Sequence, residues 1–191
     1  MQTFNENKFI AYDTLDLRPR VSKHLIHCIK KYGEHNQYKT SIRLGYAVCK
    51  VFQPWKHNRD DFDLIRHLIS NKASQMVNKS LFARKDIWGL HYTGDLNYCH
   101  YHNHGKFNGY AGVLYLEADE DCGQLHFPEY DIYVEPEPNR IILFDPRIKH
   151  GVMPNLDQSS NRVAIAFNVD VISDALLGKN NISKDNLKTD K

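Results

Sequence analysis

The sequence predicts a mainly β fold with helices in its N-terminal part. From about Trp88 onward, short runs rich in β-branched and aromatic residues follow one another, such as YAGVLYLE, RIILF and RVAIAFNVDVI, and this composition is typical of strands. Turn residues separate the runs, as in CGQ, EPEPN and MPNLDQSSN. No helical pattern interrupts them. A sandwich or barrel of strands is therefore favoured over a parallel sheet with crossover helices.

Two helices are predicted ahead of these strands. In VSKHLIHCIKKYG, apolar side chains recur at helical intervals from Val21 to Tyr32, and Gly33 is the expected stop. The segment SIRLGYAVCKVF predicts a strand between the helices. The second helix has Asn58 or Asp60 as its N-cap. Its apolar face contains Phe62, Ile65, Leu68, Ile69, Met76 and Val77.

These patterns divide the chain into three segments of one domain, because 191 residues is an ordinary domain length. Residues 1–85 are expected to form a layer of helices and a strand that packs on the β core. Residues 86–175 are expected to form the core itself. Residues 176–191 are polar, and we expect a disordered tail there.

The composition argues against several classes of partner. The formal net charge is only +2, so neither nucleic acid nor a membrane surface is indicated as the main partner. No window approaches the roughly 18 apolar residues of a membrane span, and the first residues lack an apolar signal core. The four cysteines form no C-x-x-C pair. We expect a cytoplasmic protein with reduced thiols. Nothing in the sequence indicates an oligomeric state.

Three histidines at alternate positions, His100, His102 and His104, lie in the run YTGDLNYCHYHNHGKFNGY. On a strand, alternate side chains share one face, and three imidazoles on one face are either solvated or gathered around a ligand. Neutral imidazole is a good ligand for first-row divalent metals. A further ligand must then come from a distant strand, and His150, just beyond the apolar run IILF, is the candidate.

Arg162 opens the last predicted strand, NRVAIAFNV. Alternation places Val163, Ile165 and Phe167 on one face of this strand. Arg162 shares the opposite face with two alanines, which leaves room for a ligand. A guanidinium group can bind a carboxylate through two parallel hydrogen bonds, whereas the simpler interpretation is a solvated arginine at a strand end.

The run from Tyr92 to Asn168 resembles the iron(II)/2-oxoglutarate-dependent oxygenases, in particular their small prolyl-hydroxylase-like bacterial and phage members. The likeness implies a double-stranded β-helix, a jelly-roll barrel of the kind that cupins share, with the helices packed outside. The matching motifs, in order, are Tyr92-Thr-Gly94, His100-Tyr-His102, VLYLE from Val113, Gly123-Gln-Leu-His-Phe127, Pro138 to Phe144, His150 and Arg162.

The resemblance implies roles for these residues. His100 and His150 match the two histidine ligands of the iron, Arg162 matches the arginine that binds the distal carboxylate of 2-oxoglutarate, and Tyr92 matches a tyrosine that hydrogen-bonds the same co-substrate. The implied cofactors are Fe(II), 2-oxoglutarate and O2. The implied reaction hydroxylates a C–H bond of a small molecule or of a peptidyl or prolyl side chain, with decarboxylation of 2-oxoglutarate to succinate.

One position departs from the family pattern, because His102 occupies the place of the carboxylate ligand in H-x-D. His102 could ligate as a third imidazole beside His100 and His150. The motif could instead be His102 and His104, or the carboxylate position could be filled by water or an anion. The spacing from Gly94 favours His100 and His102.

Two alternative functions are considered. A metal-dependent cupin shares the barrel, and Gly94 with His100-x-His102 matches its opening motif, but Lys106 and Phe107 occupy the region where its glutamate ligand is expected. A non-catalytic jelly-roll module that only binds a ligand or partner is favoured by the missing carboxylate.

Overall fold

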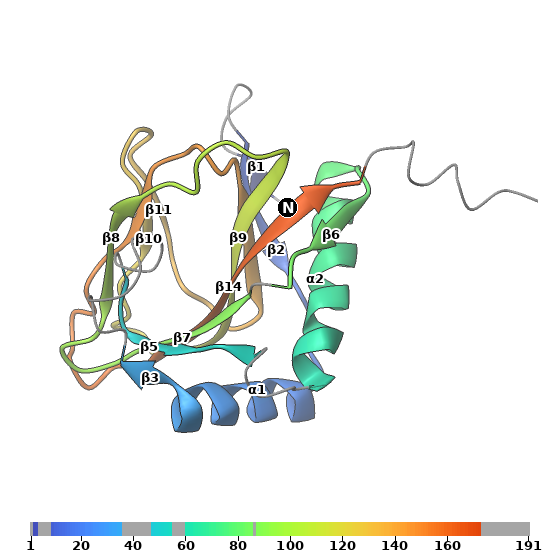
Figure 1. The fold of residues 1–191 in the computed structure, drawn as a ribbon. Coiled ribbons are helices and arrows are strands. Elements are labelled where there is room, and N and C mark those ends of the chain that lie inside the picture. The colour runs from blue at the N-terminus through green and yellow to red at the C-terminus, as the bar shows by residue number, and fades with distance from the viewer. Residues whose placement is uncertain (1, 4–8, 36–46, 55–59, 86, 173–191) are drawn as a thin grey trace, which may run out of the picture.

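The computed structural model describes residues 2–3, 9–35, 47–54, 60–85 and 87–172. Two β-sheets face each other, and two helices cover the outer side of the larger sheet (Figure 1). Neighbouring strands are antiparallel throughout the described residues. The predicted mainly β, jelly-roll fold is confirmed, although in the described part of the chain the two sheets do not close into one barrel.

The larger sheet has nine strands. Its order is β1 (Gln2–Thr3), β2 (Ile10–Thr14), β12 (Arg140–Phe144), β9 (Gly109–Ala118), β14 (Arg162–Val171), β7 (Trp88–Tyr92), β5 (Lys50–Phe52) and β3 (Glu34–His35), with β6 (Leu81–Ala83) beside β14. The smaller sheet has the order β11 (Ile132–Val134), β10 (Leu125–Phe127), β13 (His150–Val152), β8 (Tyr98–His102) and β4 (Ala47–Val48).

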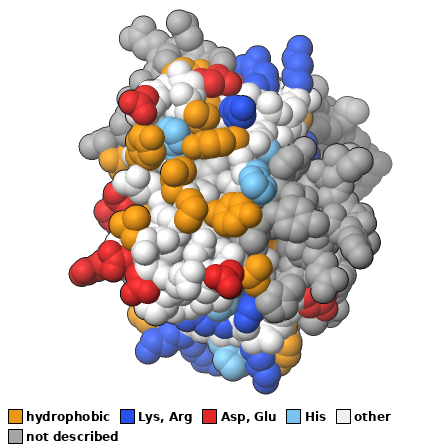
Figure 2. All heavy atoms as spheres, turned by 90° about the vertical axis from the view of Figure 1, so that its left-hand side faces the viewer, with side chains coloured by type: hydrophobic (Ala, Val, Ile, Leu, Met, Phe, Trp, Pro, Cys, Tyr) orange, Lys and Arg blue, Asp and Glu red, His pale blue; other side chains and the backbone are white. Residues whose placement is uncertain are grey.

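The outer face of the smaller sheet carries exposed aromatic side chains. Tyr101 of β8 and Tyr133 of β11 are both exposed, and the ring of His126 stacks on Tyr133 with a centroid distance of 4.0 Å. Figure 2 shows this side of the molecule, with apolar side chains gathered in its upper half. The opposite face of the smaller sheet looks toward the larger one.

The two helices have the extents expected from their apolar patterns. Helix α1 spans Pro19–Tyr32, and the N–H of Gly33 donates to the carbonyl of Ile29 at its end. Helix α2 spans Asp60–Val77, so Asp60 lies in its first turn, and the other predicted cap, Asn58, lies outside the described residues. Both helices bury apolar side chains against the outer side of the larger sheet, namely Leu25, Cys28, Ile29, Phe62, Ile65, Ile69 and Ala73.

Strand β14 has two faces that serve different parts of the fold. Val163, Ile165 and Phe167 belong to the core beneath the helices, as the alternation predicted. Ala164 belongs instead to the core between the two sheets, which also contains Phe127 and Phe144. Since side chains alternate along a strand, the even-numbered residues of β14 all look toward the smaller sheet, where the candidate site lies.

The segment before residue 86 contributes strands to both sheets as well as the helices. Strand β2 pairs with β12, and β4 pairs with β8. The predicted tail at residues 176–191 lies outside the described residues. No helix in the described part of the chain is long and apolar enough to cross a membrane. All four cysteines are buried, and none of them forms a disulfide.

Candidate functional site

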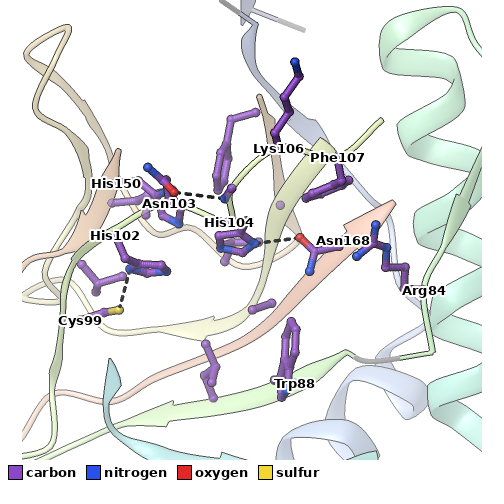
Figure 3. A pocket seen from close by; sticks show the side chains of 18 of the residues that line it. Arg84, Trp88, Cys99, His102, Asn103, His104, Lys106, Phe107, His150 and Asn168 are labelled. Carbon is purple, nitrogen blue, oxygen red and sulfur yellow. Dashed lines mark hydrogen bonds between the residues drawn. The ribbon is translucent and has the colours of Figure 1, made fainter. Parts of the chain in front are cut away.

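Three histidines from two neighbouring strands of the smaller sheet and from the loop after one of them meet at a cavity between the sheets. His102 ends β8, His104 lies in the loop that follows, and His150 begins β13. One ligand atom from each ring lies within 4.8 Å of the other two. Ring centroids are 4.4 Å apart for His102 and His150, 5.1 Å for His104 and His150, and 5.4 Å for His102 and His104 (Figure 3).

A β-bulge decides which histidines join this cluster. His102 pairs with His150, but the next pair is Cys99 with Val152, so three residues on β8 advance against two on β13. Cys99 and His102 therefore both face the cavity, although they are three positions apart in the chain. Gly151 lies opposite the bulge, where a Cβ atom would approach the Tyr101 ring to 2.7 Å.

The expectation that His100 shares the face of His102 is corrected by this geometry. Strict alternation does not continue through a bulge, so His100 is exposed and its ring packs edge-on against Tyr98, with a centroid distance of 5.0 Å. The structure does not bring His100 to the cluster and brings His104 there instead. Of the arrangements considered from the sequence, the geometry corresponds to His102 with His104.

The three imidazole rings share one hydrogen-bonding pattern, in which Nδ1 is bonded to an oxygen and Nε2 is left for another ligand. In each of them Nδ1 contacts an oxygen that can only accept, so Nδ1 carries the hydrogen and the lone pair is on Nε2. This arrangement is typical of metal-binding histidines, whose second nitrogen is fixed by an acceptor. The contacts are His102 to the carbonyl of His100 (2.8 Å), His104 to Oδ1 of Asn168 (2.8 Å) and His150 to the carbonyl of Ile148 (3.0 Å).

Burial keeps these imidazoles neutral. It lowers the pKa of His102 and of His104, and it lowers the pKa of His150 well below the ordinary value. The neighbouring rings lower the pKa of His150 further. A divalent metal therefore does not have to displace protons from the cluster near neutral pH.

The cavity beside the cluster has a volume of about 590 Å³. Trp88, Leu90, Val113 and Ala166 supply apolar wall, and Phe107 lies in the loop that leads into β9. Cationic and amide side chains are also present, but no aspartate or glutamate is found among the described residues that line it. No carboxylate of the H-x-D kind in the described part of the chain therefore lies beside the cluster, and His104 occupies the second position after His102.

Arg162 and Tyr92 are partners on adjacent strands, β14 and β7. Tyr92 lines the cavity, and the guanidinium carbon of Arg162 lies 4.3 Å from the centre of its ring. Arg162 is fully buried and donates hydrogen bonds to the carbonyls of Asn97 (3.2 Å) and Gly123. Its Nε has no hydrogen-bond partner, and no acidic side chain of the described residues pairs with it. Buried charges are generally paired, so this guanidinium is a candidate position for an anion.

Tyr115 is a polar group of this region that the sequence did not single out. It lies on β9 opposite Ala164, and its buried hydroxyl has no hydrogen-bond partner. Burial raises its pKa to about 12, with the positive charge of Arg162 acting in the opposite direction. The available signal was a tyrosine within the otherwise apolar run VLYL.

The donor groups fit a metal and a carboxylate at separate places. Three neutral imidazole nitrogens suit a first-row divalent ion. The unpartnered Nε of Arg162 and hydroxyl of Tyr115 suit a carboxylate, because both are buried donors without an acceptor.

No protein-family model and no curated protein matches the sequence. Solved structures do match the fold. A viral collagen prolyl hydroxylase from Paramecium Bursaria Chlorella virus-1, in complex with 2-oxoglutarate, is 16% identical with a TM-score of 0.59 over 85% of this chain and 96% of the other. A Trichoplax adhaerens prolyl hydroxylase, bound to a peptide fragment of hypoxia inducible factor, is 16% identical with a TM-score of 0.57 over 84% and 83%.

The α-ketoglutarate-dependent carbocyclase SnoK from nogalamycin biosynthesis is 11% identical, with a TM-score of 0.64 over 89% of this chain and 85% of the other. At these identities the comparisons establish the fold, which is that of the 2-oxoglutarate-dependent oxygenases, as the sequence motifs suggested.

Proposed function

We propose that the protein is an Fe(II)- and 2-oxoglutarate-dependent dioxygenase that hydroxylates a C–H bond of its substrate. The observation that carries the proposal is the cluster of His102, His104 and His150, whose ligand atoms lie within 4.8 Å of one another beside a cavity. The buried, uncompensated Arg162 behind Tyr92 adds a place for an anion. The fold shared with enzymes of this chemistry supports the same assignment.

The three histidines would hold iron through Nε2, because Nδ1 of each ring is already hydrogen-bonded. When bound, iron and 2-oxoglutarate together supply the oxidising chemistry, in which decarboxylation of the co-substrate to succinate accompanies hydroxylation of a C–H bond. With His104 in the carboxylate position, the protein contributes no negative charge to the metal. The charge of the co-substrate would therefore compensate more of the metal charge than in a site with an aspartate ligand.

Arg162 and Tyr92 would bind the distal carboxylate of 2-oxoglutarate. The carboxylate would neutralise the buried guanidinium and accept a hydrogen bond from its unpartnered Nε. Tyr115 offers a further buried hydroxyl donor in the same region. The apolar wall around Trp88 and Ala166 would exclude water from the cavity.

The remaining cavity would accept a small molecule or a peptide side chain. The fold neighbours include both kinds, since one is bound to a peptide fragment and another is a carbocyclase from nogalamycin biosynthesis. O2 would be the third reactant. Replacement of the carboxylate by His104 favours a second candidate, a binding module with the same fold and no turnover.

An anaerobic titration of apo-protein with Fe(II) and 2-oxoglutarate separates the two. Iron-bound 2-oxoglutarate is expected, by resemblance to the family, to give a visible charge-transfer band. The band should appear with the wild type and should be absent from His150→Ala, which should lose metal loading. His100→Ala is the matched control, because this histidine is exposed and outside the cluster.

Three results would count against the proposal. Metal binding without the band would favour the non-catalytic module. Equal loss of metal in His100→Ala and His150→Ala would contradict the ligand assignment. Persistence of the band in Arg162→Ala would contradict the assignment of the carboxylate site.

A further inference from the structure

Asn168 lies on β14 with its side chain in the cavity, next to His104 (Figure 3). It is buried, with 6% of its surface exposed, and its Oδ1 lies 2.8 Å from Nδ1 of His104. We propose that Asn168 is a positioning residue that fixes the tautomer and the orientation of His104 as a metal ligand. The inference rests on the metal-binding part of the proposed function.

His104 needs such a partner more than the other two histidines do. The rings of His102 and His150 are held by carbonyls two residues earlier in the chain, at His100 and Ile148, so local backbone geometry orients them. The loop fixes only the backbone of His104, whose N–H donates to the carbonyl of Pro146 (2.8 Å). The acceptor for its ring comes from β14, 64 residues further along the chain.

The need arises from the replacement of a carboxylate by an imidazole. Both oxygens of an ionised carboxylate can bind a metal, so such a ligand has no tautomer to choose. A neutral imidazole has its lone pair on only one nitrogen, and an acceptor at Nδ1 places that lone pair on Nε2. The amide oxygen of Asn168 supplies this acceptor without adding a charge.

The fold also fixes Asn168 itself. Its backbone carbonyl accepts a hydrogen bond from the N–H of Arg84 (2.9 Å), and its strand is paired with Ala111 of β9 on the other side. On the same face of β14, the small side chain of Ala166 leaves the space in which the ring and the amide meet. A rigid strand thus holds a loop histidine.

The proposal predicts a defined loss of metal affinity. Hydrogen-bond partners of metal-binding histidines typically contribute about 10- to 100-fold in affinity. Asn168→Leu removes the acceptor while keeping a similarly branched, though larger, side chain, and should weaken binding by about this factor. Asn168→Asp restores an acceptor and should recover affinity to within a few-fold of the wild type, or exceed it. Asn168→Ala, which adds no bulk, should show the same loss as the leucine variant.

The test is a titration of apo-protein with Co(II), followed by its visible ligand-field absorption. The matched control is Asn161→Leu, because Oδ1 of Asn161 likewise contacts a histidine ring, Nε2 of His91 (3.0 Å), outside the cluster. This control should leave Co(II) affinity and the spectrum unchanged. Equal affinity of the wild type and both the leucine and alanine variants at position 168 would overturn the proposal.

A double-mutant cycle separates positioning from a general structural role. In a His104→Ala background there is no ring to orient, so Asn168→Leu should change Co(II) affinity by less than about twofold. The same 10-fold or larger loss in both backgrounds would mean that Asn168 acts through something other than His104, and the proposal would be wrong.

The outcomes also distinguish this inference from the proposed function. Co(II) binding with the predicted variant pattern, but no binding of 2-oxoglutarate, would support the role of Asn168 and contradict the dioxygenase. Binding of both metal and co-substrate, with no effect of the variants at position 168, would support the dioxygenase and contradict the role of Asn168. A wild-type protein that binds no metal would contradict both.

Discussion

Replacement of Arg162 by methionine should remove the response of the protein to 2-oxoglutarate without removing the metal. Arg162 is fully buried, and no acidic side chain of the described residues compensates it. A carboxylate bound there would become the second half of a buried, hydrogen-bonded charge pair. Methionine fills a similar volume and cannot bind an anion, whereas the three histidines line the cavity, which Arg162 itself does not.

The magnitude follows from the burial of the pair. Removal of one member of a buried, hydrogen-bonded charge pair costs about 2–5 kcal/mol of binding free energy. Since about 1.4 kcal/mol corresponds to a factor of ten, the Kd for 2-oxoglutarate should rise roughly 30-fold to several thousand-fold. At a ligand concentration of about 100 times the wild-type Kd, the co-substrate stabilises the folded state by about 2.7 kcal/mol. A 100-fold weaker site leaves about 0.4 kcal/mol under the same conditions.

Thermal unfolding with Co(II) in place of iron measures this difference. For a chain of this size, about 1 kcal/mol shifts the Tm by roughly 2–4 °C. The wild type should therefore gain about 5–10 °C from 2-oxoglutarate, and Arg162→Met should gain only about 1 °C. A shift in the variant as large as in the wild type would refute the assignment of Arg162.

Arg140→Met is a suitable control for the same experiment. Its guanidinium also lies over a tyrosine ring, that of Tyr12 at 4.9 Å, but unlike Arg162 it pairs with an acidic side chain, Glu137. This variant should keep the full response to the co-substrate, whatever its own Tm.

Three further predictions concern neighbouring features. Tyr115→Phe removes a buried hydroxyl without a partner, so the urea midpoint of the apo-protein should stay equal or rise. The Kd for 2-oxoglutarate should increase roughly 5- to 10-fold, because the lost hydrogen bond contributes about 1 kcal/mol. An unchanged Kd would exclude this hydroxyl from the site. Phe167→Ala should lower the free energy of unfolding by about 3–5 kcal/mol, because the ring is fully buried beneath the helices, and a loss below about 1 kcal/mol in urea unfolding would contradict the packing. The apo-protein should keep its stability above about pH 6.5 and lose it on acidification, because burial lowers the folded-state pKa of four histidines and the unfolded chain then binds more protons, at up to about 1.4 kcal/mol per pH unit for each of them. Urea midpoints at pH 7.5 and 5.5 test this, and equal midpoints would contradict it. The four histidines are His91, His102, His104 and His150.

The sequence by itself determined the features that depend on local periodicity. The spacing of apolar residues predicted both helices, and the alternation in NRVAIAFNV predicted that Val163 and Phe167 share one face of β14; the structure shows that this face packs toward the helices. His150 and Arg162 could be singled out because each follows or opens an apolar strand. The fold class followed from the succession of strands without intervening helices.

Only the tertiary structure decided which histidines meet. Whether a strand contains a bulge depends on its partner strand, and the bulge of β8 against β13 turns His100 outward and leaves His102 at the cavity. The positions of His104 and Asn168 were also beyond local patterns, because a loop and a strand 64 residues apart in the chain form that contact. Periodicity is a property of consecutive residues, whereas a metal site is assembled from side chains that only the pairing and packing of distant strands bring together.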